Sequence, residues 1–297
     1  MSDKEAVERF MAYLTDEKKA SGNTLSAYRR DLASFSSYIL SEDRDVSSMT
    51  CDDIEAYKTY LHGKGLSAAS VSRSMSSVRG LYRYLLVSGI VDDDPTRTVK
   101  NDKAVKPEFA FLTAKEIEKL LATPDLATFK GIRDKAMLET LYATGMKVTE
   151  LISLNVSDVN LALGFVTCRA ETKQKHDRTV FLYPAAVKAV EKYLSASRRF
   201  LADPDNEALF VNLTGSRMTR QGFWKILKGY AGEAGIKKTI TPHTLRHSFA
   251  VHLLANGADI KDIQAILGHA DIASTQVYAN FLKSRVKESY LKFHPRA

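Results

Sequence analysis

Cysteine is scarce in this sequence, and long apolar runs are missing from it. The 297 residues include two cysteines, Cys51 and Cys168, too few and too far apart for a disulfide framework or a thiolate metal site. Residues 85–91, among the longest apolar stretches, are broken by Ser88 and Gly89 and fall far short of the roughly 20 residues that span a bilayer. The first ten residues have neither the basic nor the apolar region of a secretory signal. We therefore expect a cytoplasmic protein in a reducing compartment, with no membrane partner.

Positive charge is in excess, with a formal net charge of +8. This excess favours a polyanionic partner, with nucleic acid as the first candidate and a membrane surface as the second. Residues 1–100 hold 14 basic and 15 acidic side chains, so the excess lies in the remainder. An acid-free interval between Glu55 and Asp92 nevertheless contains a basic stripe that includes Arg73, Arg79 and Arg83. The stripe is compatible with a phosphate-tracking surface and equally with a solvated helix face.

The first ninety residues show helical periodicity throughout. The predicted helices cover residues 5–19, 24–40, 50–63 and 68–87. Gly22 is expected to end the first of them, and Thr50 with Asp53 forms a capping-box pattern at the start of the third. Residues 92–109 are polar, contain Pro95 and Pro107, and read as a linker. We therefore predict a helical domain over residues 1–105 and a second domain over residues 106–297.

The second domain is predicted to mix helices with a small sheet. Two β-prone runs, residues 163–169 and 178–182, flank a polar stretch and suggest a hairpin, with a further strand at 208–211. The predicted helices cover residues 113–121, 128–142, 184–200, 219–231, 244–255, 259–267 and 274–281, followed by one through 291. The fold class expected is mainly α with a small β-sheet in the C-terminal domain.

Residues 242–282 hold polar side chains that an apolar helix pattern does not require. His243 and Arg246 are three apart, so on one helix they share a face and can converge on one anion. His269 follows a glycine, and Tyr278 lies nine residues further on. These side chains supply what a metal-free phosphoryl transfer needs: charge neutralisation, proton transfer and a nucleophile. His243 and His247 are also spaced as a metal pair, but no glutamate stands in the HEXXH position and no third ligand is obvious. We expect neither a metal nor a cofactor.

The order HTLRHSFA, from residue 243, and then LGHADIASTQVY, ending at residue 278, closely resembles the signature of the tyrosine recombinase (phage integrase) family. The resemblance covers nearly the whole chain and is strongest to Xer-type site-specific recombinases. It implies an N-terminal four-helix, SAM-like core-binding domain and a C-terminal α+β catalytic domain that together clamp DNA. It also implies DNA cleavage and rejoining through a 3′-phosphotyrosyl intermediate, in chromosome dimer resolution or in movement of a mobile element.

The resemblance assigns roles residue by residue. Tyr278 resembles the nucleophile, Arg246 the second active-site arginine, and His243 the histidine of the HxxR pair. His269 resembles the histidine that binds a non-bridging phosphate oxygen. The mechanism expected from these matches has His243 accepting the proton of Tyr278 while Lys147, Arg246 and His269 hold the scissile phosphate.

The resemblance also implies a general acid in the predicted β-hairpin. Lys173, in TKQKHDRTVFL, aligns with the family's hairpin lysine, and Arg178 with the arginine that closes that motif. Thr172 and Gln174 replace the family's glycines, so the choice of Lys173 over Lys175 rests on counting back from Arg178.

The stretch ATGMKVTELISL matches the family's first arginine box except that Lys147 stands where the family has arginine. Lysine keeps the charge but loses the planar fork that reaches two phosphate oxygens. Losing one preorganised donor costs about 10² to 10³ in rate. The substitution is compatible with a slow recombinase, with a DNA-binding paralogue that no longer cuts, or with an arginine replaced in the protein studied. Glu150 is expected to orient Lys147.

The expected partner is a double-stranded DNA recombination site. Phosphate contacts are predicted from both domains, by Arg73, Arg79, Arg83, Lys225 and Lys228, with Lys237 and Lys238 as further candidates. The tail after Tyr278 resembles the family's C-terminal helix, which docks on a neighbouring protomer, although docking in cis is an alternative. A homo- or hetero-tetramer on DNA is therefore expected. The rival functions are a DNA-binding protein without strand transfer and a type IB topoisomerase-like relaxase.

Overall fold

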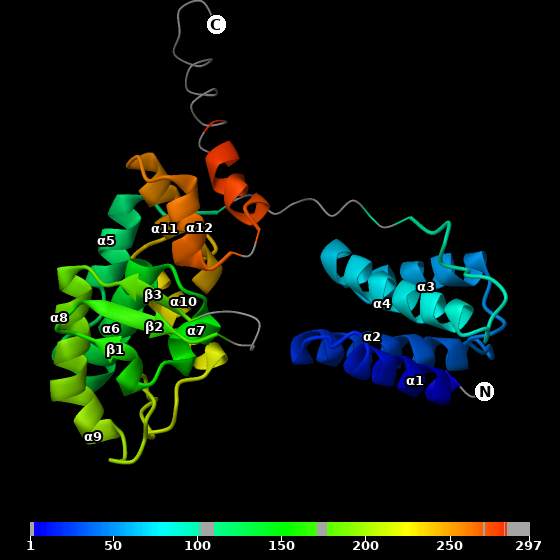
Figure 1. Ribbon diagram of the computed structural model, residues 1–297, viewed down its shortest axis with the longest axis horizontal. Coiled ribbons are helices and arrows are strands. Elements are labelled where there is room, and N and C mark those ends of the chain that lie inside the picture. The colour runs from blue at the N-terminus through cyan, green and yellow to red at the C-terminus, as the bar shows by residue number, and fades with distance from the viewer. Residues whose placement is uncertain are drawn as a thin grey trace, which may run out of the picture. The chain divides into compact units, whose positions relative to one another are not determined.

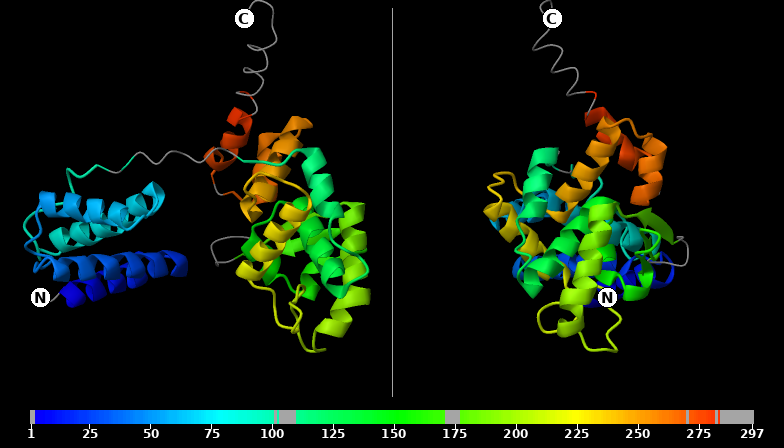
Figure 2. Two further views of the ribbon diagram at one scale, coloured as in Figure 1. Left: turned by 180° about the vertical axis from the view of Figure 1, so that it is seen from behind. Right: turned by 90° about the vertical axis from the view of Figure 1, so that its left-hand side faces the viewer.

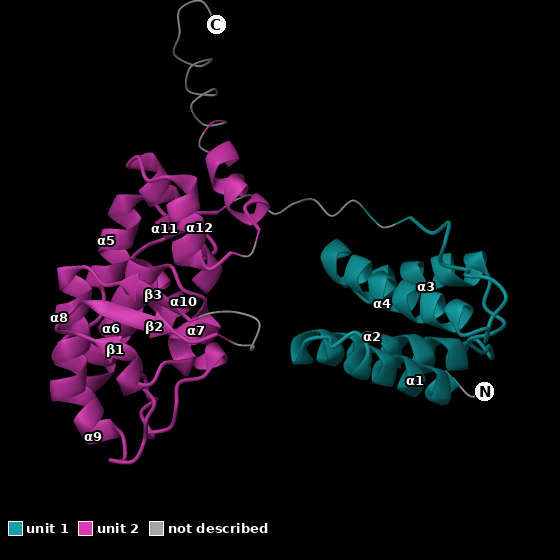
Figure 3. Ribbon diagram, viewed as in Figure 1, with its two compact units in different colours: residues 1–107 teal, residues 108–297 magenta. Residues whose placement is uncertain are grey.

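The structure is a computed structural model that describes residues 3–100, 102, 110–170, 177–269, 271–281 and 283. The chain folds into two compact units, residues 1–107 (unit 1) and 108–297 (unit 2), drawn in different colours in Figure 3. Each unit has its own hydrophobic core. The assignment of separate functions on either side of residue 105 stays a prediction.

Unit 1 is a bundle of four helices. They are α1 (Asp3–Asp16), α2 (Gly22–Ser41), α3 (Cys51–Gly63) and α4 (Ala68–Val87), with α1 beside α2 and α3 beside α4 (Figure 1). Ser21 and Thr50 cap two of the helices, since their hydroxyls accept a hydrogen bond from the backbone N–H three residues on. Gly22 begins α2, whereas α1 already ends at Asp16, so the expected role of this glycine was wrong. Phe35, Tyr57 and other fully buried side chains fill the bundle.

Unit 2 combines helices with one small antiparallel sheet. Its helices are α5 (Ala114–Ala122), α6 (Phe129–Thr144), α7 (Val148–Ser153), α8 (Pro184–Tyr193), α9 (Arg199–Leu201), α10 (Arg220–Glu233), α11 (Pro242–Ala255) and α12 (Ile260–Leu267). A 3₁₀ turn, η1 (Val156–Asp158), precedes the sheet, and a π-helical turn, η2 (Leu194–Arg198), joins α8 to α9. The strands β1 (Val159–Asn160), β2 (Phe165–Cys168) and β3 (Arg178–Phe181) pair in the order β1-β2-β3. The predicted hairpin is confirmed, with Val166 opposite Val180.

Helix α6 forms the centre of the unit 2 core. Most of its residues are buried, and it contacts α5, α7, α8, α11 and β3. It ends at Gly145, whose φ of 58° is left-handed. A Cβ at this position would lie 2.4 Å from Cδ1 of Phe249 on α11. Glycine therefore allows the end of α6 to approach α11 closely.

Secondary structure was also predicted for two further segments of unit 2. The strand predicted over residues 208–211 was wrong, because Ala208 and Val211 form isolated bridges, to Asn155 and Arg217 respectively. Residues 273–281 are helical, as predicted, and the helix predicted through residue 291 lies mostly outside the described residues. No helix in the described part of the chain is long and apolar enough to cross a membrane.

Candidate active site

The candidate site lies where α11, α12 and the helical residues 273–281 pack together at one end of unit 2 (Figures 1 and 2), and Glu150 and Arg178 link the start of α7 to the end of α12. Helix α11 is capped by Thr241 and begins with Pro242, a residue suited to the first helical turn. It carries His243, Arg246 and His247 in its first two turns. These elements therefore bring together side chains that are up to 131 positions apart in the sequence, since Lys147 precedes α7 and Tyr278 lies in the last helical segment.

Tyr278 is buried, with 3% of its surface exposed. Its hydroxyl is hydrogen-bonded to Nδ1 of His247 at 3.0 Å. Its ring stacks on His269, with ring centroids 6.4 Å apart and an interplanar angle of 10°. Burial raises the pKa of the phenol, although the Arg246 guanidinium opposes the shift. The phenol is therefore protonated at neutral pH.

Both histidines that contact Tyr278 are weak bases. The pKa of His247 is lowered to about 4 by burial, with His243, Arg246 and His269 adding to the shift. The pKa of His269 is also lowered to about 4, by burial and then by nearby positive charges, Arg246 first. Nδ1 of His269 lies 2.9 Å from the Thr275 hydroxyl. Both imidazoles are therefore neutral at pH 7 and act as hydrogen-bonding groups there.

Arg246 joins the ends of two helices. It is 4% exposed, its Nη1 donates to the carbonyl of Gly145 at 2.7 Å, and its Nη2 donates to the carbonyl of Leu267 at 2.6 Å. Those carbonyls belong to the C-terminal ends of α6 and α12, where a cation is favoured. The guanidinium is thus fixed in position before any anion binds, close enough to His247 and Tyr278 to influence the pKa of each.

Arg178 and Glu150 form a second fixed group. Nη1 and Nη2 of Arg178 reach the two carboxylate oxygens of Glu150 at 2.6 and 2.8 Å. The carboxylate also accepts the backbone N–H of Lys147 at 2.6 Å. Burial alone would raise the pKa of Glu150, but Arg178 and the Lys147 N–H outweigh it and lower that pKa. Glu150, expected to orient Lys147, accepts the Lys147 backbone N–H and also pairs with Arg178.

Lys147 adds to the positive field of the site, and His243 lies in that field as a neutral imidazole at pH 7. Lys147 is the half-buried N-cap residue of α7. Burial lowers the pKa of His243, and Arg220, Arg246 and Lys147 lower it further. His243 is exposed at the start of α11, with its ring centroid 6.4 Å from that of His247. These groups together form a cationic site suited to a phosphate.

Sequence reasoning missed a groove beside His243. It has a volume of about 430 Å³ and includes Arg220, Trp224 and Pro242 in its lining. Trp224 is partly exposed, and the ammonium of Lys228 lies 5.5 Å from its ring centroid. A cation beside an exposed aromatic ring is a signal that the sequence contained, because Arg220, Trp224 and Lys228 share one face at helical spacing.

The remaining predicted residues fall into three groups. Lys173 and Lys175 lie outside the described residues, as do Thr172 and Gln174. Arg73 is paired with the buried carboxylate of Asp31, Arg79 donates to the carbonyl of Val99 at 3.1 Å, and Lys238 is paired with Glu116 at 2.8 Å. Among these predicted phosphate contacts, Arg83, Lys225, Lys228 and Lys237 are exposed, as is the paired Lys238.

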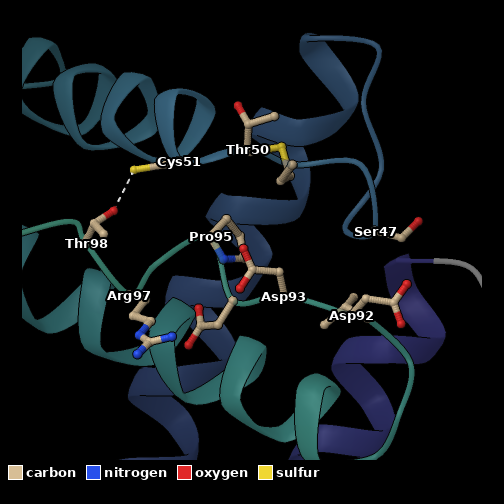
Figure 4. A pocket seen from close by; sticks show the side chains of 11 residues that line it. Ser47, Thr50, Cys51, Asp92, Asp93, Pro95, Arg97 and Thr98 are labelled. Atoms are coloured by element: carbon tan, nitrogen blue, oxygen red, sulfur yellow. Dashed lines mark hydrogen bonds between the residues drawn. The ribbon is translucent and has the colours of Figure 1, made fainter.

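Two other features bear on ligand binding. In the described part of the chain no group of three or more His, Cys, Asp or Glu side chains could hold a metal ion, and the His243–His247 pair belongs to no such group. A cavity of about 890 Å³ lies in unit 1, where Cys51 Sγ is 2.9 Å from the Thr98 hydroxyl (Figure 4). Its lining includes Asp92, Asp93 and Asp94 against a single arginine, Arg97. This lining repels phosphate.

Comparison with known proteins agrees with the geometry. Residues 110–285 match the Phage integrase family, and residues 7–89 match the Phage integrase, N-terminal SAM-like domain. The chain is 46% identical to tyrosine recombinase XerD of Oceanobacillus iheyensis and 43% identical to that of Listeria monocytogenes, covering 98% of this chain and 99% of each relative. The chain therefore belongs to the phage integrase family. Within it, the chain is similar to the Xer-type tyrosine recombinases.

Solved structures show the same fold. The crystal structure of XerA recombinase is 31% identical, with a TM-score of 0.54 and full coverage of both chains. The crystal structure of XerH bound to palindromic difH substrate, a post-cleavage complex, is 21% identical, with a TM-score of 0.78 over 95% of this chain and 83% of that one. Both the SAM-like domain and the small sheet of the predicted fold class are confirmed.

Proposed function

We propose that this chain cleaves and rejoins double-stranded DNA at a specific site, with Tyr278 as the nucleophile of a 3′-phosphotyrosyl intermediate. The hydrogen bond between Tyr278 and His247, set beside the fixed guanidinium of Arg246, is the observation that carries the proposal. A buried phenol bonded to a neutral imidazole and flanked by a cation is what attack on a phosphodiester requires.

The proposed step uses the cationic groups to hold the scissile phosphate. Arg246, Lys147 and His269 bind its non-bridging oxygens, where negative charge gathers in the transition state. The Tyr278 oxygen bonds to phosphorus while the bond to the 5′-oxygen breaks, and that oxygen leaves as a hydroxyl with a proton from Lys173. A 5′-hydroxyl of a partner strand then attacks the phosphotyrosine and releases Tyr278. The energy of the broken phosphodiester is retained, so no ATP is needed.

Lys147 favours one second candidate, a DNA-binding protein that no longer cuts. Its ammonium keeps the charge at the position where the family has a forked donor. The rest of the site is nevertheless assembled, since Glu150 holds the Lys147 backbone and Arg246 holds two helix ends. This supports a slow recombinase over an inactive one.

The biological setting follows from similarity and charge. Likeness to XerD over nearly the whole chain favours chromosome dimer resolution in the cytoplasm, at the nucleoid, over movement of a mobile element. Arg83, Lys225 and Lys228 are exposed and are proposed to contact DNA phosphates, together with Arg79 and Arg73. Assembly as a homo- or hetero-tetramer would use the residues after 283, which lie outside the described part of the chain.

A plasmid with two direct copies of the host's dimer-resolution site tests this function. It is incubated with the purified chain in an extract of the source organism from which this chain's gene has been deleted. The proposal predicts two smaller circles, with none formed by Tyr278→Phe. Relaxation of a plasmid without the site would instead show a relaxase. Site-specific binding with no product from either the parental chain or Lys147→Arg would show a binding protein.

A further inference from the structure

We propose that His247 takes the proton from Tyr278 as the phenol attacks phosphorus, a role that sequence matching had given to His243. This inference rests on the proposed function. Nδ1 of His247 lies 3.0 Å from the Tyr278 oxygen, within the range of roughly 2.6–3.2 Å over which a general base removes a proton. The two ring centroids are 5.5 Å apart. His247 would therefore be a catalytic residue, since it touches the reacting atom.

The position of His247 is fixed by the helix that carries it. It is half-buried in the second turn of α11, where its neighbours Arg246 and Ser248 are buried on either side. Arg246 donates to Gly145 and Leu267, and the Ser248 hydroxyl accepts the backbone N–H of Leu112 at 2.8 Å. These bonds fix α11 on both sides of His247. A base held in this way needs little reorganisation to accept the proton.

The direction of the hydrogen bond follows from the charge states of its two partners. Burial raises the pKa of Tyr278, so the phenol carries its proton at neutral pH. The pKa of His247 is lowered to about 4, so its imidazole is neutral and has one ring nitrogen without hydrogen. With the imidazole hydrogen on Nε2, Nδ1 accepts the phenol hydrogen. The contact is then the arrangement that precedes proton transfer.

Substrate binding would strengthen this base. The charged and titratable groups that face His247 are His243 and Arg246 on α11, His269 after α12, and Tyr278 itself. The first three lower its pKa, after burial. A phosphodiester bound by Arg246 and Lys147 adds negative charge beside the same imidazole and opposes their effect. The phenol is thus kept protonated until a phosphate is present.

The step balances in both directions. The proton moves from the Tyr278 oxygen to Nδ1 of His247, the bond from that oxygen to phosphorus forms, and the bond to the 5′-oxygen breaks as that oxygen takes a proton from Lys173. During rejoining, the incoming 5′-oxygen bonds to phosphorus and gives its proton to Lys173, the bond between phosphorus and Tyr278 breaks, and the phenolate recovers its proton from the His247 imidazolium. No oxidant, reductant or further reactant is needed.

Two variants on the same helix form a matched test. His247→Asn keeps a hydrogen-bond acceptor near the position of Nδ1 but cannot hold a proton. His252→Asn changes a histidine of α11 whose Nδ1 lies 2.8 Å from the hydroxyl of Tyr142, a similar pair away from Tyr278. Single-turnover formation of the covalent adduct is measured on a nicked duplex carrying the host's dimer-resolution site. We expect a loss of about 10² to 10⁴ for His247→Asn and no loss at this step for His252→Asn.

A substrate with sulfur in place of the scissile 5′-oxygen separates the base from the general acid. A thiolate leaves without a proton, so this substrate restores cleavage by Lys173→Ala. It does not restore cleavage by His247→Asn, because the phenol still needs a base. Recovery of His247→Asn on the sulfur substrate would overturn the assignment. A parental rate of cleavage by His247→Asn on the oxygen substrate would also overturn it. A faster rate would overturn it as well and would show that His247 restrains Tyr278.

The pH profile of the parental chain tests the same point without any variant. On the sulfur substrate the general acid is bypassed, and the rate should rise with pH to a plateau as His247 loses its proton. A rate that keeps rising up to pH 9 would show direct ionisation of the phenol and overturn the assignment. If neither the parental chain nor Lys147→Arg forms an adduct while both bind the site, the proposed function itself fails. If the parental chain forms the adduct and His247→Asn forms it at the same rate, the role of His247 is refuted while the proposed function stands.

Discussion

Arg178 forms a bidentate ion pair with Glu150 through both terminal nitrogens, and each partner also hydrogen-bonds to a different element of the site. The Nε of Arg178 donates to the carbonyl of Ile266 at the end of α12, while Glu150 accepts the backbone N–H of Lys147 at the start of α7. One ion pair thus ties β3 to the two elements from which Lys147 and His269 project. Its side chains are 19% and 10% exposed, so water screens it little.

Glu150→Gln should destabilise the fold by about 3 kcal/mol, because it leaves the mostly buried Arg178 guanidinium without a counter-charge. Urea unfolding measures the change. The control is Arg9→Gln, which breaks an exposed ion pair to Glu5 and should cost less than about 1 kcal/mol. Equal, small losses of unfolding free energy for the two variants would show that the Arg178–Glu150 ion pair does not stabilise the site.

Gly268→Ala should destabilise the fold more than Gly235→Ala. Both glycines have left-handed φ values, 63° and 69°, so each variant carries a backbone strain of about 1–2 kcal/mol. A Cβ at Gly268 would also lie 3.0 Å from Nη1 and 3.1 Å from Cζ of Arg178, whereas at Gly235 it meets nothing within 4 Å. Thermal unfolding of the two variants compares them. Equal midpoints would contradict the close packing of Arg178 on Gly268.

Stability should fall as the pH drops below about 6.5. His247 and His269 have pKa values near 4 in the folded chain, below the ordinary 6.5, so the unfolded chain binds more protons between these values. The free energy of unfolding is therefore greatest above pH 6.5 and decreases as the pH falls toward 4. Urea unfolding between pH 7 and pH 5 should show a shallower pH dependence for His247→Asn. An unchanged dependence would mean that this imidazole is not held neutral.

DNA affinity should fall steeply with salt, with the logarithm of the binding constant linear in the logarithm of salt concentration. Arg83 is exposed, and Arg83→Gln should reduce the magnitude of that slope by about 1. Arg73→Gln should change the slope less, because Asp31 already neutralises that guanidinium. Fluorescence anisotropy over a salt series measures the slopes of the parental chain, Arg83→Gln and Arg73→Gln. A flat salt response of the parental chain would contradict extensive phosphate contacts.

Local signals in the sequence were sufficient for the helices and for the motif. Capping boxes at Thr50 and Thr113 mark helix starts because their partners lie three residues away. The order and spacing of HTLRHSFA and LGHADIASTQVY carried the resemblance to the family, which implied the roles of Arg246, His269 and Tyr278.

What the sequence could not show are the tertiary contacts. Arg246 and Gly145 are 101 positions apart, and Arg178 and Glu150 are 28 apart, so no local spacing links them. The HxxR spacing drew attention to His243, whereas the packing of the last helical segment against α11 places Tyr278 against His247, 31 positions away. That packing is a property of the assembled core.

The most direct test of the central claim is covalent trapping on a nicked duplex that carries the host's recombination site, comparing the parental chain with Tyr278→Phe and Lys147→Arg. We predict an adduct from the parental chain and none from Tyr278→Phe. Lys147→Arg should form it about 10² to 10³ times faster, because the forked donor is restored. An adduct that persists in Tyr278→Phe, or none from any variant on a site that the chain binds, would contradict the account.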